Sequence, residues 1–86
     1  MKRLIVRNKV KDFAVWKPIF DEQIEAGRTA GMEVENLWRC SDDPNEVFFI
    51  MTVADREAAD AYMADPKSAE VGERSGVIEG ECWYVE

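Results

Sequence analysis

The sequence predicts an α+β domain in which two main helices cover one face of a four-stranded antiparallel sheet. Three observations lead to this prediction: an apolar stripe of helical spacing near the N-terminus, a later strand that is apolar on both faces, and the order strand–helix–strand–strand–helix–strand. A chain of 86 residues has material for one hydrophobic core, so residues 1–86 are predicted to form a single domain.

The first helix is predicted over residues 12–28, because five apolar or small residues recur there at intervals of three or four. They are Phe13, Trp16, Phe20, Ile24 and Gly27. This spacing places one apolar stripe along one side of a helix. Asp12 is a suitable N-cap, and Gly31 lies where the helix should end. Pro18 lies past the first turn, where its missing N–H predicts a bend in the helix axis.

Four stretches have the composition of strands: residues 4–6 continuing to about Asn8 or Val10, 32–40, 46–53 and 77–85. Residues 41–45 are rich in turn formers and are predicted to close a hairpin. Strict alternation in the second stretch predicts that one set of side chains shares a face: Met32, Val34, Asn36, Trp38 and Cys40. The third stretch is apolar on both faces, which is typical of a central strand.

Two shorter helices complete the prediction. The first spans about residues 56–65, with Asp55 as its N-cap and Ala58, Ala59, Tyr62 and Met63 buried. The second spans residues 67–74, follows the pair Asp65–Pro66 and ends at Gly76. The resulting order is that of the split βαβ, or ferredoxin-like, fold, in which the first and third strands are central.

The third strand also predicts a homodimer. Val47, Phe49, Met51 and Val53 alternate along it with Phe48, Ile50 and Thr52, and helices on one face can cover only one of these sets. Leaving large apolar side chains in water forgoes about 1.5–3 kcal/mol for each. A second copy packed against the open face of the sheet would cover the other set.

Composition narrows the classes of function. The net charge of −7 argues against nucleic-acid binding, and no apolar run approaches the length of a membrane span, so a cytoplasmic protein is expected. Histidine is absent, and Cys40 and Cys82 lack metal-ligand spacing and are predicted to be reduced and buried. We therefore expect no metal and no cofactor. Six basic residues in residues 1–17 could form an anion site, but pairing with nearby acids is the favoured interpretation.

Three segments carry a family resemblance: residues 12–22, residues 41–47, and Val77 with the C-terminal Trp83-Tyr84-Val85. Together they resemble the dimeric α+β barrel superfamily, in particular the small antibiotic-biosynthesis-monooxygenase-like and cyclase-like proteins. The resemblance implies a face-to-face sheet dimer with a small-molecule pocket in each subunit. Some members of this family oxidise aromatic or polyketide-like compounds without a cofactor, the substrate anion supplying the electrons, whereas others degrade haem, isomerise lactones or have no established activity. The haem degraders use a histidine ligand that this chain lacks, so a cofactor-independent monooxygenase or a related small enzyme is the leading expectation. A non-catalytic binding protein and a purely structural dimer remain the alternatives.

The resemblance also suggests site residues. Asn8 and Trp38 stand in roughly the places of a strand asparagine and a strand tryptophan that matter in relatives, so they are the candidate catalytic residues. Asn36 and Tyr62 are the candidate substrate-binding residues, each with a polar group on an otherwise apolar face. Ordinary packing is the competing interpretation for all four. We expect these residues to surround one pocket between the sheet and the helices.

Overall fold

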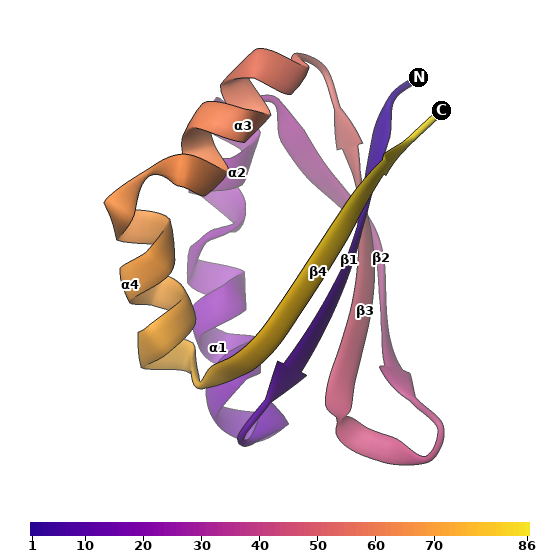
Figure 1. The fold of residues 1–86 in the computed structure, drawn as a ribbon, viewed down its shortest axis with the longest axis vertical. Coiled ribbons are helices and arrows are strands. Elements are labelled where there is room, and N and C mark those ends of the chain that lie inside the picture. The colour runs from indigo at the N-terminus through magenta and orange to yellow at the C-terminus, as the bar shows by residue number, and fades with distance from the viewer.

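Four antiparallel strands form one sheet, and the helices lie on a single face of it (Figure 1). The computed structural model describes residues 1–86. The strands are β1 (Arg3–Val10), β2 (Met32–Cys40), β3 (Asp43–Val53) and β4 (Val77–Val85), in the spatial order β2-β3-β1-β4. The helices are α1 (Phe13–Glu22), α2 (Ile24–Thr29), α3 (Arg56–Ala64) and α4 (Pro66–Ser75). The predicted ferredoxin-like α+β fold, with the first and third strands central, is confirmed.

The predicted first helix is interrupted, but not at the proline. Asp12 caps α1 by accepting a hydrogen bond from the N–H of Ala14, and α1 runs through Pro18 without a break. Proline has a helical φ, and here it lies on the exposed side of the helix. The interruption comes at Gln23, whose N–H donates to the carbonyl of Phe20 and whose backbone separates α1 from α2. The prediction of a bend at Pro18 is therefore wrong. The helix is interrupted five residues later, a little more than one turn further along.

The caps of the two later helices follow the sequence prediction. The side chain of Asp55 accepts from the N–H groups of Glu57 and Ala58, and that of Asp65 accepts from the N–H of Lys67. Gly76 ends α4 in the left-handed conformation, with φ of 84°, which glycine adopts without steric cost. None of the helices is long and apolar enough to cross a membrane.

The side chains between helices and sheet form two separate buried clusters. The first consists of Leu4, Met32, Val53 and Ala59. The second consists of Val10, Trp16, Val47 and Phe49. Half-buried Val6 and Met51 pack against both clusters, so they mark the place where the two parts of the core meet. The core is therefore divided along the length of the sheet.

An irregularity in β2 changes which residues face the helices. Val34 lies opposite Met51, but the register then shifts, so that Leu37 lies opposite Phe49 and packs on the second cluster. Asn36 and Trp38 lie opposite Ile50 and Phe48, on the face that no helix covers. The predicted single alternation of residues 32–40 is wrong, because the bulge between Val34 and Asn36 moves the second half of the strand to the opposite face.

The open face of the sheet combines apolar side chains with ion pairs. Trp38 is 53% exposed and Trp83 is 48% exposed, with Phe48 and Ile50 half-buried between the edge strands. Arg7 bonds Glu46 and also reaches Glu79 and Glu81 at 3.5 and 2.9 Å. Both faces of β3 are therefore apolar, as predicted, and only one of them is covered within the chain.

The two cysteines are free thiols. Cys40 is half-buried and Cys82 is exposed on the edge strand β4, so the prediction that both are buried is wrong for Cys82. No group of three or more carboxylate, cysteine or histidine side chains is arranged to hold a metal ion.

Candidate ligand-binding site

A cavity of about 230 Å³ lies between the helices and the sheet. It is lined by Val6, Trp16, Phe20, Gln23, Ile24, Gly27, Met32, Val34, Phe49, Met51, Tyr62, Met63, Ser68, Val71, Gly72, Ser75 and Val77. Both core clusters contribute walls, so the cavity occupies the division between them. An apolar cavity of about 150 Å³ can hold a benzene ring, so this one has room for a ring with substituents or a small fused system.

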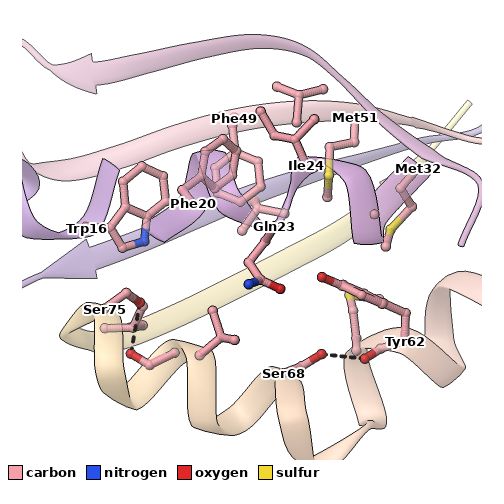
Figure 2. Close-up of a pocket in the computed structure, with 17 residues that line it drawn as sticks. Trp16, Phe20, Gln23, Ile24, Met32, Phe49, Met51, Tyr62, Ser68 and Ser75 are labelled. Atoms are coloured by element: carbon pink, nitrogen blue, oxygen red, sulfur yellow. Dashed lines mark hydrogen bonds between the residues drawn. The ribbon is translucent and has the colours of Figure 1, made fainter. Parts of the chain in front are cut away.

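Aromatic rings build one end of the cavity (Figure 2). The rings of Trp16 and Phe20 stack with their centroids 4.7 Å apart, and Phe20 meets Phe49 edge-on at 4.9 Å. Trp16 and Phe20, both from α1, thus pack against Phe49, which comes from β3. Planar aromatic ligands pack favourably against faces and edges arranged in this way.

Methionines border the other end. Figure 2 shows Met32 of β2 and Met51 of β3 there, and Met63 of α3 also lines the cavity. Methionine side chains are flexible and polarisable, so they adapt to ligands of irregular outline. The cavity is therefore rigid at its aromatic end and adaptable at the other.

Four polar residues line the cavity, and two of them are already engaged. The hydroxyl of Ser68 donates to the carbonyl of Tyr62 at 2.6 Å, and that of Ser75 donates to the carbonyl of Gly72 at 3.1 Å. The carboxamide of Gln23 and the hydroxyl of Tyr62 have no such protein partner, and Figure 2 shows both reaching into the middle of the cavity, toward each other. These two groups are available to a ligand.

The environment keeps the Tyr62 hydroxyl neutral. Burial raises the pKa of Tyr62 above its usual value of about 10, and the negative charge of Asp65 raises it further. At neutral pH this side chain is therefore an O–H donor, and the Gln23 amide supplies N–H donors and a carbonyl acceptor. None of the lining residues carries a charge, so the cavity offers hydrogen-bonding groups but no charged acid or base.

Of the four residues predicted to surround a pocket, one does so. Tyr62 lines the cavity. Asn36 and Trp38 lie on the opposite face of the sheet because of the bulge in β2. Asn8 lies on β1 opposite Gly80, and its Oδ1 is close enough that a Cβ at residue 80 would approach it to 3.1 Å. Asn8 shares the helix-covered face with its partner Val47 but does not line the cavity, whereas Asn36 and Trp38 lie on the open face, so the structure does not bring the four residues together.

Sequence reasoning missed Gln23. A signal was present, because Gln23 lies three residues after Phe20 and four before Gly27, which places it within the apolar stripe of the first helix. A polar residue inside such a stripe needs a partner or a ligand for its amide. Its place at the break between α1 and α2 orients that amide toward the cavity.

The fold and the cavity define a class: a ferredoxin-like α+β sheet with a small-molecule-sized, partly open cavity beneath its helices. No protein-family model matches the chain, and no curated protein sequence does. Solved structures with this fold include an antibiotic biosynthesis monooxygenase, which is 20% identical with a TM-score of 0.71 and matches 100% of this chain and 97% of that chain.

Two further structures share the fold. SnoaB, a cofactor-independent oxygenase from Streptomyces nogalater, is 19% identical with a TM-score of 0.74, over 99% of this chain and 90% of that chain. Protein Atu4242 from Agrobacterium tumefaciens is 17% identical with a TM-score of 0.73, over 100% and 92%. The chain shares the fold of these solved structures, an antibiotic biosynthesis monooxygenase among them, which confirms the predicted resemblance at the level of fold.

Proposed function

We propose that the cavity binds a compact aromatic or polyketide-like molecule carrying an ionisable oxygen, and that the protein acts on it as a cofactor-independent monooxygenase. The observation that carries this proposal is the pair of unpartnered donors, Gln23 and Tyr62, in an otherwise apolar enclosure. A few polar groups within an apolar cavity orient a small ligand and select its substituents. The shared fold with a cofactor-independent oxygenase supports the choice of reaction.

The chemistry relies on the acidity of the substrate. The O–H of Tyr62 and the N–H of Gln23 stabilise a phenolate or enolate oxygen, and the aromatic wall of Trp16 and Phe20 holds the ring in place. The anion donates electrons to dioxygen. One oxygen atom bonds to a substrate carbon that becomes a carbonyl, and the other leaves as water with two hydrogens from the substrate, so no external reductant is needed.

Oxygen consumption tests this proposal. With 2-naphthol as the probe, purified protein should take up dioxygen in the absence of any added metal, flavin or reductant. Tyr62→Phe should slow the uptake at least tenfold, because it removes one donor to the developing anion. Uptake that depends on an added reductant, or that proceeds equally well in Tyr62→Phe, would contradict the proposal. The roles predicted for Asn8, Asn36 and Trp38 are not included, because none of them lines the cavity.

A second candidate function is binding without turnover. The observation that favours it is the absence of any charged residue among those lining the cavity, which leaves no group to take a proton from a weakly acidic ligand. Saturable binding of 2-naphthol by calorimetry, with no oxygen uptake at any pH from about 6 to 9, would select this candidate over the oxygenase.

The open face of the sheet supports the proposal that the protein acts as a homodimer. Its exposed tryptophans, Trp38 and Trp83, flank apolar Phe48 and Ile50, and the same face carries both arginines and glutamates. A two-fold axis through such a mixed surface can bring opposite charges of the two copies together. We also propose that this dimer is cytoplasmic and that it binds neither nucleic acid nor membrane.

Sedimentation velocity tests the dimer. At micromolar concentration the wild type should sediment at about twice the mass of the chain, and Trp38→Glu should shift it to the monomer. Val15→Glu is the matched control, because Val15 is 51% exposed, similar to Trp38, but lies on α1 rather than on the sheet. A monomeric wild type, or equal effects of the two substitutions, would exclude this interface.

A further inference from the structure

Three of the five glycines have a backbone or packing reason to be glycine. Gly31 and Gly76 have φ of 81° and 84°, in the left-handed region that side chains disfavour. A Cβ at Gly80 would approach Oδ1 of Asn8 to 3.1 Å, which leaves little room for it. These positions are explained by the fold alone.

The other two, Gly27 and Gly72, lie within helices and both line the cavity. Neither has a positive φ, and a glycine inside a helix lowers stability relative to alanine. A Cβ at Gly27 would make an ordinary contact of 3.7 Å with the carbonyl of Met32, and a Cβ at Gly72 would meet nothing within 4 Å. Packing within the chain therefore does not require glycine at residue 72.

Gly72 borders the middle of the cavity. It lies four residues after Ser68 and three before Ser75, on the same side of α4. Figure 2 shows Ser68 beside Tyr62 at one end of the cavity and Ser75 beside Trp16 at the other. The missing side chain thus widens the cavity between the aromatic end and the polar pair.

We propose that Gly72 is a specificity-determining residue: its bare backbone admits the second ring of a fused two-ring phenol. This inference rests on the proposed function, because it assumes that an aromatic ligand occupies the cavity. A side chain at residue 72 enters space that is empty in the protein, so it competes with the ligand rather than with neighbouring protein atoms. A one-ring phenol fits the space that remains.

Calorimetric titration with phenol and with 2-naphthol tests the inference. Wild-type protein should bind both probes, 2-naphthol more tightly. Gly72→Leu should weaken the binding of 2-naphthol at least tenfold, change that of phenol less than threefold, and leave the melting temperature equal or higher. Ala69→Leu is the matched control, because it adds the same side chain to an exposed site on the same helix and should change neither affinity.

The outcomes separate this inference from the function on which it rests. If the wild type binds neither probe, the proposed ligand class is wrong and the role of Gly72 is excluded with it. If the wild type binds both but Gly72→Leu loses them equally, or loses neither, the inference alone is overturned. Should Gly72→Leu fail to fold, Gly72→Ala replaces it, with an expected loss of about threefold for 2-naphthol only and a raised melting temperature.

Discussion

Two neighbouring phenylalanines on β3 experience different environments. Phe49 points beneath the helices, where it is buried and contacts the rings of Trp16 and Phe20. Phe48 points to the open face, opposite Trp38 and the ion-paired Arg7. The side chains of the covered face are apolar and leave a cavity between them. The open face carries more charged side chains, and no other element of the chain covers it. A strand that is apolar on both sides can thus serve two purposes: one face encloses a cavity and the other presents a surface.

The largest expected effect comes from removing the ring on the covered face. Phe49→Ala should lower the free energy of unfolding by about 3–5 kcal/mol, because it deletes a buried aromatic group beside an existing cavity. Phe48→Ala, one residue away, should cost about 1 kcal/mol when both substitutions are made in the monomeric Trp38→Glu variant, where no second copy covers the open face. Urea unfolding measures both. Equal losses would show that the two faces of β3 do not differ in the way described.

A smaller effect is expected at high pH, from the edge of the covered face. The hydroxyl of Tyr84 donates to Asp60 on α3 at 2.5 Å, and the guanidinium of Arg56 lies 4.1 Å above its ring. Burial, with the hydrogen bond and charge of Asp60, raises the pKa of Tyr84 to about 12. In the unfolded chain that pKa is about 10, so the stabilisation is intact below about pH 10 and is lost as the pH rises toward 12.

Urea midpoints measured at about pH 9 and about pH 11 test this contribution. The wild type should lose more stability over this interval than Tyr84→Phe, which has no hydroxyl to ionise. An identical loss in the two proteins would mean that the contact between Tyr84 and Asp60 does not join β4 to α3 in solution.

The smallest expected effect on stability belongs to Tyr62→Phe. The hydroxyl of Tyr62 has no protein partner, so its removal should change the free energy of unfolding by no more than about 0.5 kcal/mol. Binding of 2-naphthol should nevertheless weaken about tenfold, the equivalent of one hydrogen bond of about 1.4 kcal/mol. Tyr84→Phe is the opposite case and should alter stability without altering binding. A large loss of stability in Tyr62→Phe would assign its hydroxyl to the fold.

Local patterns predicted most of the fold. The spacing of Phe13, Trp16 and Phe20 and the caps at Asp55 and Asp65 act within a few residues, so they are readable in the sequence. The bulge in β2 is different, because it depends on how that strand pairs with β3. No residue type between Val34 and Leu37 predicts it from the sequence. A shift of one residue was enough to move two predicted site residues to the opposite face.

The candidate site was predictable only in part. Tyr62 was found because its hydroxyl stood out on an apolar helical face. Gln23 was missed because its position at a helix break, rather than its type, directs its amide into the cavity. Gly72 gave no signal, since the meaning of an absent side chain depends on the empty space beside it, and that space exists only in the folded protein.

The three tryptophans allow a direct test of whether a ligand enters the covered face and not the open one. Trp16 lines the cavity, whereas Trp38 and Trp83 lie on the open face. In a two-dimensional NMR titration with 2-naphthol, the indole N–H signal of Trp16 and the side-chain amide signals of Gln23 should shift saturably, while those of Trp38 and Trp83 stay in place. Saturable shifts of Trp38 and Trp83, with Trp16 and Gln23 unchanged, would show that the ligand binds the open face of the sheet and not the cavity.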